Sequence, residues 1–134
     1  MNALRRTALF LAALLILLAV TACAAGDHGL SPSHPVQLTI LHYYNGTQKE
    51  LFDQMVDQFN QTVGAQKGII ISAQSQGGVN DLQNAVRDAV DGKVGAQEAP
   101  DIFAAYADIA YAFNQEGRLA DLAQYMTEEE IAAY

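Results

Sequence analysis

Three short stretches of this 134-residue chain are together rich in aromatic and amide side chains. They are "HYYNGT" at residues 42–47, "QSQGG" at residues 74–78 and "AAYA" at residues 104–107. None of them brings together a nucleophile, a base and an acid, which covalent or acid–base catalysis requires. The Asp, Glu and His residues elsewhere are isolated and typical of a protein surface. We therefore expect no enzyme activity, and a chemistry of non-covalent binding.

The elements that would position these stretches alternate between strands and helices. Short runs of β-branched and apolar residues predict strands at residues 37–41, 69–74 and 101–105. Apolar residues at helical spacing predict helices at residues 48–62, from 80 or 81 to 90, and 106–116. This alternation predicts an α/β fold with a parallel sheet flanked by helices. Since ligands of such sheets bind beyond the carboxyl ends of the strands, the three stretches fall where a site is expected.

Several local signals refine the helix and strand boundaries. Thr47 to Glu50 fits a capping box, residues 64–68 interrupt the first helix, and Asn80 or Asp81 is a suitable cap for the second. Gly117 is a plausible stop for the third helix, and "TEEE" at residues 127–130 announces a fourth. The aliphatic run at residues 69–71 suits a strand that is covered on both faces.

The single cysteine, Cys23, ends an apolar run at the start of the chain. Arg5 and Arg6 precede this run, which is shorter than the roughly 20 apolar residues of a membrane-spanning helix. The pattern predicts an export signal at residues 1–22. The string "VTAC" resembles the bacterial lipobox, which implies a diacylglycerol on Cys23 as the new N-terminus. An ordinary cleavage site and an uncleaved anchor are the alternatives.

Composition narrows the partners of the exported chain. Without residues 1–22, the remaining 112 residues keep five of the seven Lys and Arg residues and all 15 Asp and Glu residues, so the net charge falls from −8 to −10. This charge argues against binding of nucleic acid or anionic lipid. The spacing of Cys and His predicts no metal site, and we expect no cofactor. Residues 23–35 are small, polar and Pro-containing, which is typical of a flexible tether.

The ordered set of these features resembles a known family. The lipobox, the tether, "ILHYYNGTQKELFDQMVDQFNQ" at residues 40–61, "APD" at 99–101 and "GRLADL" at 117–122 are similar to the start of bacterial extracellular solute-binding proteins of the sugar-receptor type (family 1). These are the receptors of ABC importers. The resemblance implies that residues 36–134 are part of the N-terminal lobe of a type II periplasmic-binding-protein-like fold. The family's members are longer, so the chain is expected to be incomplete.

The resemblance also implies a ligand and a site. Family members stack aromatic rings on a sugar and bond its hydroxyl groups with amides or carboxylates. Carried over by position, the ligand-binding candidates are Tyr43, Tyr44, Asn45, Gln76, Gly77 and Tyr106. Tyr43 or Tyr44 could instead pack on the sheet, and Gly77 could be a plain turn glycine.

Two functions follow as alternatives. The first is a lipid-anchored solute-binding component on the extracytoplasmic side of the cell membrane, which delivers a carbohydrate to ABC permease subunits. The second is a small anchored module of the cell envelope that docks another protein and has no role in transport.

Overall fold

The computed structural model describes residues 29–133, which form an α/β fold around a parallel sheet. The strands are β1 (Val36–His42), β2 (Ile69–Ser75) and β3 (Ile102–Phe103), in the order β2-β1-β3. β1 pairs in parallel with β2 along its whole length, from Val36 opposite Ile69 to His42 opposite Ser75. β3 adds two residues, opposite Ile40 and Leu41. The α/β class and the parallel sheet flanked by helices are confirmed.

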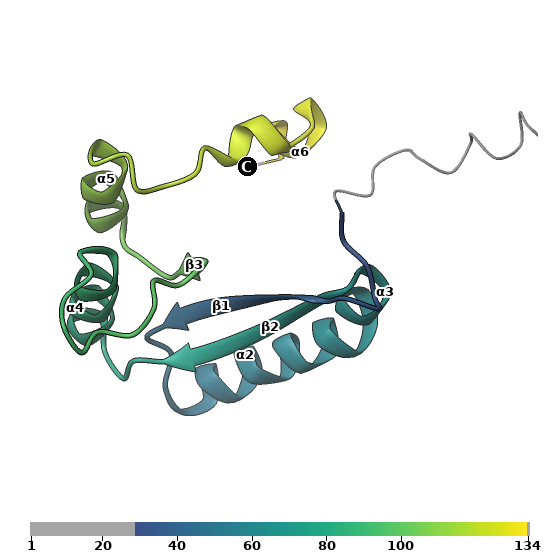
Figure 1. Ribbon diagram of the computed structural model, residues 1–134, viewed down its shortest axis with the longest axis horizontal. Coiled ribbons are helices and arrows are strands. Elements are labelled where there is room, and N and C mark those ends of the chain that lie inside the picture. The colour runs from purple at the N-terminus through teal and green to yellow at the C-terminus, as the bar shows by residue number, and fades with distance from the viewer. Residues whose placement is uncertain (1–28, 134) are drawn as a thin grey trace, which may run out of the picture.

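Helices connect the strands and flank the sheet. α2 (Gly46–Phe59) follows β1 and runs along one side of β1 and β2, while α4 (Val79–Val90) and α5 (Ala107–Gln115) stand near the carboxyl ends of the strands (Figure 1). The short helix α6 (Glu128–Ala132) follows a 3₁₀ turn, η3 (Leu122–Tyr125). Both β1 and β2 therefore point their carboxyl ends towards α4.

The first helix differs at both ends from the sequence prediction. It begins at Gly46 with Asn45 as its N-cap, so the predicted capping box of Thr47 and Glu50 is wrong. The helical path continues through the π-helical turn η2 (Asn60–Gly64) and α3 (Ala65–Lys67). It stops only at Gly68, which has a φ of 73°. A side chain there would also meet the Ser31 carbonyl oxygen at 2.2 Å, so this stop requires glycine.

The second helix and the outer strands also depart from expectation. α4 begins at Val79 with Gly78 as its N-cap, so neither Asn80 nor Asp81 is the cap. β3 is shorter than predicted at both ends, and just before it the Asp101 side chain accepts the Thr39 N–H at 2.8 Å. β2 lies at an edge of the described sheet and its Ile70 is 46% exposed, so β2 is not covered on both faces.

The remaining boundaries agree with the sequence. α5 lies within one residue of the predicted helix, and Gly117 ends it with a φ of 67°. The second capping box is present: the Thr127 hydroxyl accepts the Glu130 N–H, and the Glu130 carboxylate accepts the Thr127 N–H.

The buried core lies on the α4–α5 side of the sheet. Its fully buried apolar side chains are Leu41, Leu82, Val86 and Phe113. None of the residues of α2 is buried to that degree. Within residues 29–133, no helix has the length and apolar character that crossing a membrane requires.

The predictions for the start of the chain fall largely outside the described residues. The signal at residues 1–22, the lipidation of Cys23 and the first part of the tether at 23–35 all lie there. The end of that tether segment is described. It forms a turn, closed by the His34 N–H donating to the Ser31 carbonyl at 3.0 Å, next to Gly68.

Candidate functional site

The carboxyl ends of the three strands bring the predicted residues to one edge of the sheet. Tyr43, Tyr44 and Asn45 lie between β1 and α2, where β1 ends at His42. Gln76 and Gly77 lie between β2 and α4, and Tyr106 lies between β3 and α5. The parallel topology alone places these three connections together. Residues of the three connections also contact one another directly.

Two tyrosines from different connections form an aromatic pair. The rings of Tyr43 and Tyr106 stack with centroids 5.9 Å apart and planes at 21°. Tyr43 is half-buried against the core, and burial raises the pKa of its hydroxyl, with Tyr106 and Tyr44 adding to the shift. Tyr106 is 56% exposed. The pair therefore offers one supported ring and one open ring face at the edge of the sheet.

Asn45 ties two of the connections together. Its side-chain amide donates to the Tyr43 carbonyl at 3.1 Å and to the Gly77 carbonyl. Both acceptors are backbone atoms of residues predicted to touch a ligand. The amide N–H groups of Asn45 are thus engaged within the protein. This arrangement makes Asn45 a residue that positions the site, in addition to its predicted role as a contact.

Ser75 is a second bridging residue, and the sequence prediction did not include it. Its hydroxyl donates to the Tyr44 carbonyl at 2.8 Å and accepts the Gly77 N–H at 3.2 Å. The second contact is a turn in which a serine hydroxyl receives a backbone N–H two residues on. A serine two residues before a glycine at the end of a strand is a sequence signal for such a turn.

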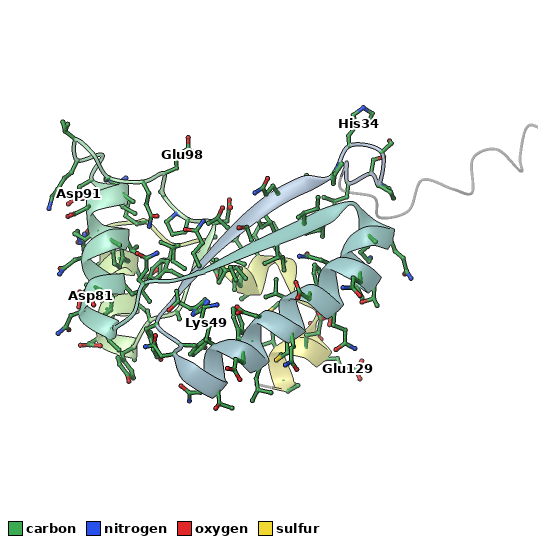
Figure 2. The ribbon with its side chains drawn as sticks, turned by 90° about the horizontal axis from the view of Figure 1, so that it is seen from below. His34, Lys49, Asp81, Asp91, Glu98 and Glu129 are labelled. Atoms are coloured by element: carbon green, nitrogen blue, oxygen red, sulfur yellow. The ribbon has the colours of Figure 1, made fainter. Side chains whose placement is uncertain are left out.

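His42 is the buried group beneath the site. It is 1% exposed, and its ring packs on Tyr44 (centroids 5.0 Å apart) and on Phe52 of α2 (4.9 Å apart). Its Nδ1 accepts the Tyr44 N–H at 3.1 Å. Burial lowers the pKa of the ring below its usual 6.5, Asp53 opposes this shift and Lys49 adds to it. Figure 2 shows α2 lying across the sheet, with Lys49 near its start.

Three helices begin at this same edge. The N-caps of α2, α4 and α5 are Asn45, Gly78 and Tyr106, and none of them caps its helix with a side-chain hydrogen bond. The first-turn N–H groups of each helix are therefore donors directed towards the edge. Asp81 and Asp108 stand in the first turns of α4 and α5, where their negative charges offset the positive helix ends. This combination suits neutral acceptors such as hydroxyl groups better than anions.

The described residues contain no group of three or more His, Cys, Asp or Glu side chains that could hold a metal ion. The comparisons with known proteins add no family to this geometry. No protein-family model matches the chain, and neither a curated protein nor a solved structure gives a significant match.

Proposed function

We propose that this protein is a lipid-anchored, extracytoplasmic solute-binding component of an ABC importer for carbohydrates. The observation that carries the proposal is the meeting of aromatic and amide groups at the carboxyl ends of three parallel strands, with Tyr43 stacked on the exposed Tyr106. In this proposal the described sheet belongs to the first lobe of a type II periplasmic-binding-protein-like fold. Cys23 carries the lipid, and permease subunits receive the solute.

The geometry supports a polyhydroxylated ligand. A sugar ring has an apolar C–H face that would stack on the open face of Tyr106, while the half-buried Tyr43 supports that ring from behind. Hydroxyl groups would accept hydrogen bonds from the free N–H groups at the starts of the three helices. The Gln76 side chain adds an amide at the same edge. Its backbone is fixed, because the Gln76 N–H donates to the His42 carbonyl at 2.8 Å.

Calorimetric titration of the complete gene product tests this proposal. The panel holds neutral mono- and oligosaccharides, polyols and sugar phosphates. We expect a neutral sugar to bind, and Tyr106→Ala to weaken it about tenfold or more through the lost stacking. Tyr111→Ala is the matched control, since Tyr111 is 65% exposed on α5 and stands outside the site. If no compound of the panel binds, sugars are excluded as the ligand class.

The anchor has its own test. Metabolic labelling with a fatty acid should mark the protein, and Cys23→Ser should lose the label and release the protein from the membrane fraction. A single acyl chain holds a protein to a bilayer only weakly, so a retained label with easy release would contradict stable anchoring. A Cys23→Ser variant that stays membrane-bound would favour an uncleaved anchor.

The second candidate, an anchored interaction module without transport, is favoured by one observation. Leu51 and Met55 on α2 are 56% and 65% exposed, although they belong to the apolar face of their helix. Together with Tyr44, Gln48 and Phe52 they line an open, mostly apolar hollow of about 400 Å³. Replacement of Leu51 and Met55 by Gln separates the two functions. It should leave sugar binding unchanged, whereas a docking module would lose its protein partner.

A further inference from the structure

His42 links the two connections that carry most of the candidate site. Its backbone carbonyl accepts the Gln76 N–H at 2.8 Å, and its ring Nδ1 accepts the Tyr44 N–H at 3.1 Å. The first contact belongs to the strand pairing, in which His42 lies opposite Ser75. The second contact depends on the side chain alone. The ring therefore fixes where the chain turns from β1 into the Tyr44 loop.

The Nδ1 contact defines the protonation state of the ring. A nitrogen that accepts a backbone N–H carries no proton, so the proton of the neutral ring is on Nε2. Nε2 is fully buried and has no hydrogen-bond partner among residues 29–133. The structure thus holds one tautomer through a single polar contact and packs the rest of the ring against Tyr44 and Phe52.

We propose that neutral His42 is the positioning residue of the strand-end site, and that protonation of its Nδ1 releases the Tyr44 loop. A protonated Nδ1 is a donor and faces the Tyr44 N–H, another donor, so the contact cannot survive. Solute binding is then strong while the ring is neutral and weakens once it is charged. This inference rests on the proposed function for the ligand, but not for the behaviour of the loop.

The charged groups around the ring do not provide a counterion. Those that act on His42 from the packed elements are Lys49 and Asp53, both on α2, and Tyr44 is the titratable group on the loop. Lys49 and Asp53 form an ion pair at 2.5 Å, so their effects on the ring largely oppose each other. Burial therefore dominates, and the switch works on the acid side of the ordinary histidine value of 6.5.

Nuclear magnetic resonance of the ligand-free, full-length protein tests the mechanism without any solute. Labelled histidine should show the Nε2–H tautomer for His42 at pH 7.5. As this ring titrates, the protection factor of the Tyr44 amide proton, which corrects its exchange rate for the intrinsic pH dependence of exchange, should fall in step with it. His34 is the internal control, because it lies in an exposed turn and its ring hydrogen-bonds only to the Ser33 hydroxyl among the described residues. A proton on Nδ1 at pH 7.5 would overturn the proposal. A Tyr44 protection factor that stays constant while His42 titrates would also overturn it.

Two substitutions separate positioning from packing. His42→Phe keeps an aromatic ring but loses the acceptor, so Tyr44 exchange should rise by up to about tenfold, the value of one hydrogen bond. His42→Asn offers a carbonyl oxygen near the position of Nδ1 and cannot titrate. It should restore slow exchange at a given pH and keep the protection factor of the Tyr44 amide constant between pH 5 and 7.5. Equal exchange in both variants would show that the ring acts only by packing.

A ligand measurement completes the test once a solute is known. The dissociation constant should rise on acidification in the native protein and stay flat in His42→Asn. If no solute binds but the Tyr44 loop still follows His42, the proposed function fails and the positioning role stands. If a solute binds equally well at pH 5 and 7.5, the proposed release on protonation is wrong.

Discussion

The two sides of the sheet are held by different kinds of contact. On the α4–α5 side, Leu82 and Val86 of α4 and Phe113 of α5 are 1–2% exposed and close over Leu41 of β1. On the other side, the apolar residues of α2 are at best partly covered, and Leu51 and Met55 lie open. The group buried there is the polar His42.

Polar and backbone contacts replace apolar burial on the α2 side. The Asn60 side chain donates to the Ile71 carbonyl at 2.9 Å and accepts the Ile71 N–H at 2.8 Å, like an added strand residue. One turn later, a side chain on Gly64 would meet the Ile69 carbonyl oxygen at 2.5 Å, so helix and strand backbones approach closely. The carboxyl end of the α2 segment is therefore fixed, while its first half covers His42 through Phe52 and leaves Leu51 and Met55 exposed.

The two sides of this sheet therefore have different roles. The α4–α5 side supplies most of the apolar burial that stabilises the described residues. The α2 side leaves room for a buried, titratable group to control a loop. Loss of apolar contacts on the α4–α5 side should thus reduce stability most, whereas loss of the His42 contact on the α2 side should mainly change the Tyr44 loop.

The largest expected effect comes from one substitution made on both sides. Leu82→Ala removes a buried side chain from α4 and should reduce the free energy of unfolding by about 2–5 kcal/mol. Leu51→Ala removes the same atoms from an exposed position on α2 and should change it by less than about 1 kcal/mol. Urea unfolding followed by circular dichroism and tyrosine fluorescence measures both, since the chain has no Trp. Equal losses would mean that the two sides contribute alike.

A smaller loss should follow when the polar attachment of α2 is removed. Asn60→Ala deletes two hydrogen bonds to β2 and leaves the Ile71 backbone groups without these partners, which should cost about 1–3 kcal/mol. Gln61→Ala, at the exposed next position, is the control and should change stability by about 0.5 kcal/mol or less. Urea unfolding measures the loss of stability in both variants. A neutral Asn60→Ala would show that backbone packing at Gly64 suffices to hold this end.

The sequence predicted the architecture because period and order alone determine it. Apolar residues at helical spacing identified the first helix, and strand–helix alternation implied the parallel sheet that the structure confirms. The starts of α2 and α4 were missed, and that of α2 depends on a contact across the chain. Asn45 ends up as the N-cap of α2 while its side chain bonds to Gly77, a residue that local capping rules do not consider.

The placement of the candidate residues at one edge of the sheet was predictable, but their contacts with one another were not. Topology brings Tyr43, Gln76 and Tyr106 to one edge regardless of their side-chain directions. The bridging roles of His42 and Ser75 depend on strand register and rotamers, which no spacing in the sequence reveals. In the same way, the periodicity predicted an apolar face on α2 but not that part of it would lie exposed.

Acidification should lower the free energy of unfolding because of His42, which is buried on the α2 side. The folded-state pKa of His42 is lowered, whereas the unfolded chain has the ordinary value of 6.5. Above pH 6.5 both states are neutral and His42 contributes its full stability. As the pH falls below 6.5, the unfolded chain binds a proton that the folded chain does not, so the free energy of unfolding drops by up to about 1.4 kcal/mol per pH unit. The drop ends once the pH passes the lowered pKa.

Unfolding curves between pH 7.5 and 5.5 test this dependence before most carboxylates titrate. His42→Asn should flatten it. A dependence that survives His42→Asn would assign the acid sensitivity to another group.

The smallest changes in stability are expected from the ion pair of Lys49 and Asp53 beside His42. Substitutions in this pair test whether the α2 side affects the His42 ring without affecting the core. Lys49 and Asp53 are an exposed i,i+4 pair on α2, worth about 0.3–0.5 kcal/mol, so removing either charge should hardly change stability. The pKa of His42 should respond in opposite directions. Lys49→Gln should raise it, because a nearby positive charge is removed, and Asp53→Asn should lower it.

Titration of the His42 ring in each variant, followed by nuclear magnetic resonance, measures this pair of shifts. Opposite shifts of the His42 pKa with unchanged stability would show that charges on α2 change the ring's titration without affecting the core on the α4–α5 side. Shifts of the same sign would mean that these substitutions act by moving α2, and the charges would then have no direct influence on the ring.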